Sequence, residues 1–373
     1  MTTFATEKMT FNIIMKKFLF MVVATMMVTM GAKAQKIQTI DKDGQPIPYA
    51  SIISEDGQFI GTTDLNGILN DVKGAEVVSI THVAYQPKKV KVGQGGKVIL
   101  EDADFGLPEI TVTKKSHVYV QTYYRLFYID DQEEFPACFY RAGVLNNSFE
   151  RQKKDLSSNE DHFSACSNGL VKAALNTLLG SYIKRIAGLR MQKVEDRMKK
   201  NHQDVGISFT SNGPGKLLIT DKFGVVGSVT DNQDKGERRY SFEAALLSKH
   251  KTLATGKDKK IAKAEKKEER EKDRVDQNFI VYRIDEKGNY SPEDLVMIQS
   301  FTSYYDTKNK CSKYIMAQVY TTDRAYVTKD ELKQMKKDNK MKMTYQNILK
   351  FERDHKIPAL SPEFQKHIQE IVK

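Results

Sequence analysis

The residues closest to a catalytic pattern lie near the C-terminus, where His367-Ile368-Gln369-Glu370 places a His and a Glu three positions apart. Two side chains at this spacing share one helix face and can hold a zinc ion, provided that a third ligand joins them. A zinc peptidase of this type takes that ligand from a distant downstream His. No His follows Glu370, and His355 precedes the pair. We therefore interpret His367 as a surface residue of a terminal amphipathic helix.

A second group of candidate ligands is acidic. Asp130, Asp131, Glu133 and Glu134 could together offer carboxylate oxygens to a calcium ion. Their spacing does not fit an EF-hand loop. We interpret this run as a solvated acidic turn.

Other motifs that carry catalytic chemistry are missing from the sequence. There is no His-Glu-x-x-His and no Gly-x-Ser-x-Gly, and Gly213-Pro214-Gly215-Lys216 lacks the rest of a phosphate-binding loop. His82 falls within a strand-like pattern. The remaining histidines are scattered without a partner set, namely His117, His162, His202 and His250. We predict no catalytic residue, no cofactor-binding residue and no metal ligand.

The three cysteines, Cys138, Cys166 and Cys311, lie far apart and at no metal-ligand spacing. An oxidising compartment would permit one disulfide and leave an odd thiol. We expect the cysteines to act as small buried residues. The sequence leaves a disulfide among them open.

The first 34 residues predict an export signal. Lys16 and Lys17 form a cationic segment, residues 18–30 are apolar apart from two threonines, and Ala32-Lys33-Ala34 has the small-x-small pattern of a cleavage site. The apolar stretch is shorter than the roughly 20 residues of a spanning helix. We expect cleavage before Gln35 and a location in the periplasm or at the outer-membrane periphery. Either Met1 or Met15 could be the start.

The net charge of +11 is concentrated in two segments. Residues 249–274 hold eleven basic and six acidic side chains, and residues 329–356 hold nine basic and five acidic. Helical Glu–Lys spacing without an apolar stripe predicts a charged helical insertion at 249–275, either protruding or partly disordered. Contact with an anionic membrane surface through 249–274 is the functional alternative to a solvated face. The sequence has no aromatic-interleaved basic groove, so we expect no nucleic-acid partner.

Short β-prone runs alternate with turn residues from Lys36 to Thr113. Asp41-Lys42-Asp43-Gly44 forms one turn signal and Asp64-Leu65-Asn66-Gly67 another. About seven short strands at spacings of about ten residues are typical of a small antiparallel sandwich. The last of these strands is expected at 110–113.

Four blocks in this stretch resemble the carboxypeptidase regulatory-like domain of exported Bacteroidetes proteins. They are Gly44-Gln45-Pro46-Ile47-Pro48-Tyr49-Ala50-Ser51-Ile52, Gly61-Thr62-Thr63-Asp64-Leu65-Asn66-Gly67, Ser79-Ile80-Thr81-His82-Val83-Ala84-Tyr85 and Leu107-Pro108-Glu109-Ile110-Thr111-Val112. The resemblance covers residues 36–113. It implies a transthyretin-like fold without a catalytic zinc site, and a binding or folding-support role. The family commonly extends the N-terminus of TonB-dependent receptors.

The sequence after Thr113 predicts an α+β domain over 117–373, with a bent antiparallel sheet and C-terminal helices. Aromatic and β-branched residues indicate long strands at 117–129 and 137–142, before a less regular stretch from Gly143. Apolar spacing predicts a helix over 170–189, whose apolar stripe consists of Leu170, Ala174, Leu178, Tyr182 and Ile186. More strands are expected at 205–210, 216–220, 225–230, 279–284, 296–304 and 314–321.

Three helices are expected at the C-terminal end. Thr328 begins the first, with Glu331 at the capping-box position. The other two are expected at 344–354 and 361–372. The chain is thus predicted to be multidomain, an Ig-like or transthyretin-like sandwich followed by the α+β domain.

Together these features predict an exported binding or assembly protein without catalytic activity, working through an envelope protein or lipid partner. Bent sheets of this kind can form half-barrels that hold lipid chains, although the aromatic strands also suit an ordinary core. The alternative is a cell-envelope hydrolase, a peptidase or glycosidase, that uses carboxylates of the C-terminal domain. Paired carboxylates leave no sequence signature, and the ligand and the oligomeric state stay open.

Overall fold

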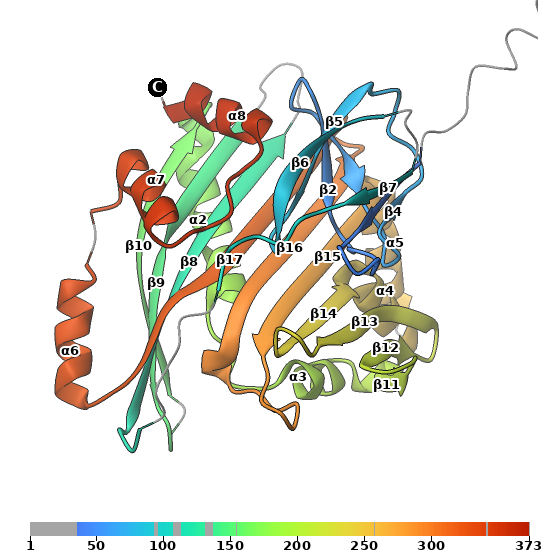
Figure 1. Cartoon of the computed structure of the whole chain (residues 1–373). Coiled ribbons are helices and arrows are strands. Elements are labelled where there is room, and N and C mark those ends of the chain that lie inside the picture. Colours follow the sequence, from blue (N-terminus) through green and yellow to red (C-terminus); the bar gives the residue numbers. More distant parts are fainter. Residues whose placement is uncertain are drawn as a thin grey trace, which may run out of the picture.

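The computed structural model describes residues 36–92, 96–106, 113–130, 137–153, 155–256, 258–340 and 342–372. In these residues the protein is mostly β-structure, arranged in several sheets, with helices at the C-terminal end (Figure 1). This agrees with the coarse prediction of a β-rich chain that ends in helices. The predicted export signal, residues 1–34, lies outside the described residues.

The N-terminal unit, residues 36–106, contains two small sheets whose strands are separated by tight turns. In one turn the Asp64 carboxylate accepts bonds from the N–H groups of Asn66 and Ile68 at 2.8 and 2.9 Å, and Gly67 follows with a φ of 71°. One sheet consists of β4 (Ile68–Leu69), β1 (Ile37–Ile40) and β7 (Gly96–Ile99), and the other of β3 (Phe59–Thr62), β2 (Ser51–Ser54), β5 (Val77–His82) and β6 (Tyr85–Lys91).

One pairing in this unit differs from the expected antiparallel arrangement. Strands β1 and β7 run parallel, with Ile37 opposite Gly96 and Ile40 opposite Ile99. A parallel pair needs a long connection between its strands, and here β2 to β6 provide it. Residues 110–112 of the predicted closing strand lie outside the described residues.

The other strands form one ten-stranded antiparallel sheet, in the order β10-β9-β8-β17-β16-β15-β14-β13-β12-β11. The last strand of the chain, β17, pairs with the first strand of this sheet, β8. The strands are β8 (His117–Asp130), β9 (Ala137–Glu150), β10 (Leu156–Cys166), β11 (Ser208–Ser211), β12 (Lys216–Asp221), β13 (Gly224–Asn232), β14 (Glu237–Glu243), β15 (Glu271–Arg283), β16 (Leu295–Asp306) and β17 (Cys311–Val327).

The prediction of an irregular stretch from Gly143 was wrong, because β9 continues to Glu150 and pairs with β10. The apolar alternation fails here because polar side chains are buried and find partners inside the protein. Tyr119 donates to Asn146 at 2.7 Å, and Ser158 donates to Asn147 at 2.6 Å. Buried polar groups with partners are tolerated in a sheet, but they hide the strand from a reading of hydrophobic periodicity.

The large sheet has an outer face, which carries Tyr124, Ile280 and Ile298, and an inner face, which carries Phe127, Phe279 and Phe301. Helices cover the outer face, and the N-terminal unit and the last two helices lie on the inner face (Figure 1). The helices are α2 (Gly169–Ala187), α3 (Val194–Asn201), α4 (Ala244–Ala254), α5 (Asp258–Arg270), α6 (Lys329–Asp338), α7 (Tyr345–Asp354) and α8 (Pro362–Val372). Two short 3₁₀ helices lie at Gln203–Val205 and Pro292–Asp294.

The predicted cap of α6 is confirmed. Thr328 Oγ1 accepts a bond from the Glu331 N–H at 3.2 Å, and the Glu331 carboxylate accepts one from the Thr328 N–H at 2.7 Å. The two residues satisfy each other's backbone donors at the helix start.

The apolar stripe expected on α2 is wrong in its first half. Leu170 is 93% exposed and Leu178 is 68% exposed, whereas Leu179 and Ile183 are buried against the sheet. On the buried side, α2 lies close to Arg141, since a Cβ on Gly180 would lie 3.1 Å from Arg141 Nη1. The helix therefore presents two leucines to solvent.

The charged insertion between β14 and β15 consists of α4 and α5, and α5 has no buried residue. Residues 271–275, which were expected to continue the helix, begin β15 instead. They pair with β16, with Glu271 opposite Asp306 and Val275 opposite Ser303. Pairing along the edge of a long neighbouring strand therefore overrides the helical charge pattern of these residues.

A single hydrophobic core joins the N-terminal unit, the inner face and the C-terminal helices. It contains Ile52 and Val78 from the unit, Phe301 and Tyr320 from the sheet, and Phe364 from α8. The expectation that the aromatic strands form an ordinary core is confirmed by this burial. The inner face is therefore filled by the protein's own two ends.

Candidate functional site

The N-terminal unit is fixed to the inner face through Gln299 of β16. The Gln299 amide donates to the Tyr49 carbonyl at 2.9 Å, and its side-chain oxygen accepts from the Val83 N–H at 3.0 Å and from Gln318 at 3.3 Å. Gln299 is 2% exposed, so water does not compete for these bonds. We call this boundary between residues 36–106 and the inner face the seam.

The same polar network reaches the C-terminal helices through Arg125 of β8. Its Nε donates to Gln318 at 2.7 Å, its Nη1 to Glu352 at 3.1 Å, and its Nη2 to the Pro358 carbonyl at 2.8 Å. Tyr123 donates to the same Glu352 carboxylate at 2.7 Å. A buried guanidinium with all three nitrogens engaged fixes the geometry around it. The N-terminal unit and α7 therefore share one buried network.

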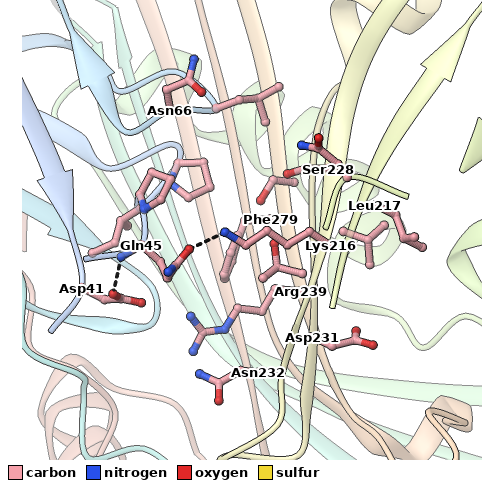
Figure 2. Close-up of a pocket in the computed structure, with 18 of the residues that line it drawn as sticks. Asp41, Gln45, Asn66, Lys216, Leu217, Ser228, Asp231, Asn232, Arg239 and Phe279 are labelled. Carbon is pink, nitrogen blue, oxygen red and sulfur yellow. Dashed lines mark hydrogen bonds between the residues drawn. The ribbon is translucent and has the colours of Figure 1, made fainter. Parts of the chain in front are cut away.

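At one end of the seam there is a cavity of about 670 Å³ (Figure 2). The turn of residues 41–48, with Leu65 and Asn66, forms one wall, and β12, β13 and β14, with Phe279, form the other. Cavities of about 300–1,000 Å³ are usual for small ligands. Both halves of the chain contribute to this one, so it exists only when the N-terminal unit is docked.

Arg239 of β14 provides a half-buried cation in the cavity wall. Its Nη1 donates to the Tyr85 hydroxyl at 3.0 Å and its Nη2 to Glu237 at 3.2 Å. Its Nε is buried and has no hydrogen-bond partner among the residues described. Burial raises the pKa of Tyr85 to about 12, so this hydroxyl keeps its proton at neutral pH.

Three charged groups elsewhere in the lining are also engaged, whereas the lining carboxylates Asp43 and Asp234 are exposed. Lys216 Nζ donates to Gln45 across the cavity (Figure 2). The Asp41 carboxylate accepts from the Gln45 N–H at 2.8 Å and so shapes its own turn, and Asp231 accepts two bonds from Arg238 at 2.7 and 2.8 Å. The neutral polar side chains of the lining include Asn66, Asn212, Ser228, Asn232 and Ser241. This lining suits a polar ligand with several hydrogen-bonding groups.

Four more buried polar atoms of the seam lack a hydrogen-bond partner within the described parts of the chain. They are the Tyr49 hydroxyl, Thr81 Oγ1, His82 Nε2 and Gln277 Oε1. Tyr49 also has a φ of 64°, which is unusual for a bulky residue. Because buried polar groups are normally paired, the seam offers unused hydrogen-bonding capacity to water or to a ligand.

Glu243 and Asp276 have raised pKa values, and each is raised chiefly by burial. The pKa of Glu243 reaches about 7, and the nearby Asp276 carboxylate adds to that rise. Glu243 pairs with Gln277 in the β14–β15 ladder, so the neighbouring Asp276 projects from the opposite face of the sheet. Neither residue lines the cavity. They do not converge as an acid and base on one substrate.

The histidines near the C-terminus make structural contacts. His367 Nε2 lies 3.3 Å from the Gly57 carbonyl, and its Nδ1 lies 3.8 Å from Glu370. His355 ends α7 and stacks on Phe351 with ring centres 3.9 Å apart. The sequence did not predict that His367 links α8 to the N-terminal unit, because 310 residues separate it from Gly57.

The candidate calcium run is described only at its first residue. Asp130 accepts a bond from Tyr128 at 2.9 Å and lies 3.4 Å from Lys313 Nζ, so a cation of the protein already occupies its surroundings. Asp131, Glu133 and Glu134 lie outside the described residues. Within the residues that are described, no group of three or more His, Cys, Asp or Glu side chains could hold a metal ion.

The other histidines that the sequence analysis considered do not come together in one site. His82 ends β5, as its pattern predicted, and packs edge-on against Phe279 with ring centres 4.7 Å apart. His250 Nδ1 lies 2.7 Å from Asp221, a pairing that the sequence analysis missed because α4 and β12 are distant in the chain. The remaining histidines contact local groups, since His117 bonds to Ser116, His162 lies 3.6 Å from Glu160, and His202 ends α3.

No disulfide joins the three cysteines, all of which lie in the described residues. Cys311 is buried as expected, whereas Cys138 and Cys166 are only half-buried. Cys166 pairs with Phe139 in the β9–β10 ladder, so the side chain of the preceding Cys138 points to the opposite face of the sheet. The two sulfur atoms cannot form a bridge from opposite faces. Burial raises the pKa of Cys138 to about 12, so this thiol keeps its proton at neutral pH.

Comparison with known proteins gives no family for the chain. No family model matches, and no curated protein matches. Among solved structures, a DUF3598-family protein of unknown function from Nostoc punctiforme is 7% identical, with a TM-score of 0.14, over 66% of this chain and 61% of that one. Its match therefore spans less than two thirds of that protein.

Two more solved structures are similarly distant. An acyl-CoA thioesterase II from Mycobacterium marinum is 7% identical over 54% of this chain and 80% of that one, with a TM-score of 0.10. A putative outer membrane lipoprotein-sorting protein domain from Vibrio parahaemolyticus is 7% identical over 57% of this chain and 89% of that one, with a TM-score of 0.11. These values assign neither a fold nor a function. Among the described residues, no helix has the length and apolar character to span a membrane.

Proposed function

We propose that the chain is an exported, non-catalytic binding protein of the cell envelope, whose ligand occupies the cavity at the seam. The observation that carries this proposal is the cavity itself, which both halves of the chain line with neutral polar side chains. Most of its charged groups are held by internal partners, as Lys216 is by Gln45 and Asp231 by Arg238. Such a lining supports binding through hydrogen bonds rather than bond-breaking chemistry.

We infer further that residues 36–113 form a transthyretin-like sandwich of the carboxypeptidase regulatory-like type. The four sequence blocks support this inference, and so do two small sheets that contribute to a shared core. Ile37 of one sheet and Ile52 and Ile80 of the other all belong to that core. In this proposal the sandwich supplies one wall of the binding site.

The lining favours a peptide or glycan segment over an acyl chain. Amides and hydroxyls such as Asn66, Ser228 and Asn232 offer donors and acceptors, whereas the apolar inner face is covered by the N-terminal unit. An envelope hydrolase that uses carboxylates is the alternative function. Glu243, with its raised pKa, is its best candidate acid, but the opposite orientation of Asp276 disfavours a pair.

The location is tested by mass spectrometry of the protein recovered from cell fractions of its own host. We expect a mature chain that begins at Gln35, found in the periplasmic or outer-membrane fraction. An unprocessed chain in the cytosol would contradict the proposed export.

The binding site is tested by blocking the cavity with Ser228→Trp. Ser157→Trp, on the exposed strand β10 outside the cavity, is the matched control. Each protein is incubated with an envelope extract rich in peptidoglycan fragments and examined by native mass spectrometry. We expect an added mass on the wild type and on the control but not on Ser228→Trp. Equal binding by Ser228→Trp would show that the cavity is not the site.

A further inference from the structure

The helices on the outer face carry much of the positive charge of the protein, in addition to residues 329–356. Residues 169–206, with α2 and α3, contain eight basic and three acidic side chains, and residues 244–270, with α4 and α5, contain nine basic and four acidic. Each segment thus has a net charge of +5. Residues 35–373 have a net charge of only +8, because residues 1–34 account for +3 of the total of +11. The residues of 35–373 that lie outside these two segments therefore have a net charge of −2, since the two segments together hold +10 against the total of +8.

Three arginines come together where α2 leads into α3, and we call them the arginine corner. Arg185 lies in the last turn of α2, Arg190 in the connection, and Arg197 on α3. Arg190 Nη2 donates to the main-chain carbonyl of Arg185. The positive charges of Arg197 and Arg190 both act on the hydroxyl of Tyr282 and oppose the rise of its pKa on burial.

Two nearby carboxylates, Glu195 and Asp276, are committed to other partners. Glu195 accepts bonds from Tyr240 and from Tyr290, the latter at 2.7 Å. Asp276 lies 3.4 Å from Arg274, and Arg185 acts on it only from a greater distance. In the described parts of the chain, no carboxylate forms an ion pair with a member of the arginine corner.

The corner therefore holds uncompensated charge. Arg197 Nη1 is buried and has no hydrogen-bond partner among the described residues. Burial lowers the pKa of Arg190, and the neighbouring Arg197 and Arg185 lower it further. A guanidinium does not lose its proton near neutral pH. The repulsion thus persists in the folded protein until an anion relieves it.

We propose that Arg185, Arg190 and Arg197 form a binding site for a phosphoryl group. Guanidinium groups present planar, forked donors that match the oxygens of a phosphate. Such a group can belong to a soluble phosphate or to a phospholipid headgroup. The exposed Leu178, two turns before Arg185 on α2, favours the lipid source because it can enter the acyl boundary. This site is independent of the cavity at the seam.

Thermal unfolding of the mature chain tests the site with inorganic phosphate, compared with chloride at equal ionic strength. We expect phosphate to raise the melting temperature of the wild type and to bind about tenfold or more weakly to Arg190→Gln and to Arg197→Gln. Lys200→Gln, an exposed cation on α3, is the control and should respond like the wild type. Without phosphate, Arg190→Gln should be at least as stable as the wild type, because it removes repulsion.

Flotation with vesicles separates the two sources of the phosphoryl group. Vesicles of phosphatidylglycerol mixed with phosphatidylcholine are compared with vesicles of phosphatidylcholine alone. If the source is a lipid, the anionic vesicles bind the wild type, and both Arg190→Gln and Leu178→Ser reduce that binding. If it is a soluble phosphate, Leu178→Ser leaves phosphate binding unchanged and the vesicles bind none of the proteins.

Two results would overturn the proposal. One is that neither phosphate nor the anionic vesicles bind the wild type better than Arg190→Gln and Arg197→Gln. The other is that Lys200→Gln weakens binding as much as they do, which would indicate diffuse attraction to the whole basic face. Either result would leave the proposed seam site untouched, because Ser228→Trp tests that site separately.

Discussion

The inner and outer faces of the ten-stranded sheet are covered in different ways. On the inner face, the two ends of the described chain pack into one core, and buried polar groups such as Arg125 and Gln299 are linked in a continuous network. On the outer face, helices pack through one side only. They leave Leu170 and Leu178 exposed and the arginine corner without carboxylate partners among the described residues.

The difference indicates which features serve folding and which serve recognition. A paired and buried network stabilises one arrangement of the chain, and the inner face follows this rule except at the unpaired polar atoms of the seam. Unpaired cations and exposed leucines add nothing to stability, so their presence is more consistent with binding. The two candidate sites thus lie where the packing rules are relaxed.

The largest effect should follow from breaking the inner network with Arg125→Ala. This change leaves the half-buried Glu352 without its guanidinium partner and Gln318 without a donor. Breaking a buried ion pair costs about 3–5 kcal/mol in the free energy of unfolding. Urea denaturation provides the measurement, with the exposed Arg353→Ala as the control. A loss below about 1 kcal/mol would mean that the network is not a stabilising unit.

Two neighbouring leucines on α2 test how this helix is oriented on the outer face. Leu179 is 2% exposed, so Leu179→Ala should lower the free energy of unfolding by about 2–5 kcal/mol. Leu178→Ala should change it by less than about 0.5 kcal/mol, because that side chain is in solvent. Equal losses in the same denaturation experiment would show that α2 is rotated from the orientation described.

His82, which lies in the seam, should make the free energy of unfolding depend on pH. Burial is the main cause that lowers the pKa of His82 to about 3, and the charge of Arg239 adds to it. The unfolded chain binds this proton below about pH 6.5, whereas the folded protein does not, so stability falls as the pH drops. The slope is about 1.4 kcal/mol per pH unit, or about 2 kcal/mol between pH 6.5 and 5.

The measurement for His82 compares unfolding free energies at these two pH values for the wild type and His82→Gln. The variant cannot take up the proton, so its pH dependence should be smaller by about 2 kcal/mol. Its stability at neutral pH is a separate quantity and does not enter the comparison. Equal pH dependence in the two proteins would place His82 in contact with water.

A smaller effect should come from the contact between the N-terminal unit and α8. Gly57 has a φ of 87°, and a Cβ there would lie 2.4 Å from His367 Nε2. Gly44 has a φ of 75° and open space around its Cβ position. Both Gly→Ala changes carry a backbone cost of about 1–2 kcal/mol, and Gly57→Ala should cost more. If urea denaturation gives the same loss for both, then α8 does not lie against Gly57.

Local features were predictable from the sequence because they depend on near neighbours. The capping box of Thr328 and Glu331 was predicted, as was the hairpin at Asn212-Gly213-Pro214-Gly215, where the Asn212 N–H donates to the Lys216 carbonyl at 2.9 Å. Strand β14 was not predicted, because its residues Glu237-Arg238-Arg239 have no apolar alternation. Those charges are paired inside the fold, which a pattern of single residues does not reveal.

The candidate sites could not be predicted from the sequence for a related reason. Gln299 and Val83 are 216 residues apart, and only the docking of the N-terminal unit brings them together. A Gln or an Arg within a predicted strand does not by itself indicate that the strand lines a binding site. A partial signal existed for the arginine corner, since residues 169–206 hold eight basic and three acidic side chains. Its significance depends on which carboxylates lie nearby.

The central claim is that the N-terminal unit and the large sheet fold as one body, because the cavity at the seam requires both. Native-state hydrogen exchange, followed by mass spectrometry, measures the opening free energy of each strand. If the claim holds, buried amides of β2 and β5 should exchange with the same free energy as those of β15 and β16. Opening of β2 and β5 at a clearly lower free energy, while β15 and β16 stay protected, would contradict it.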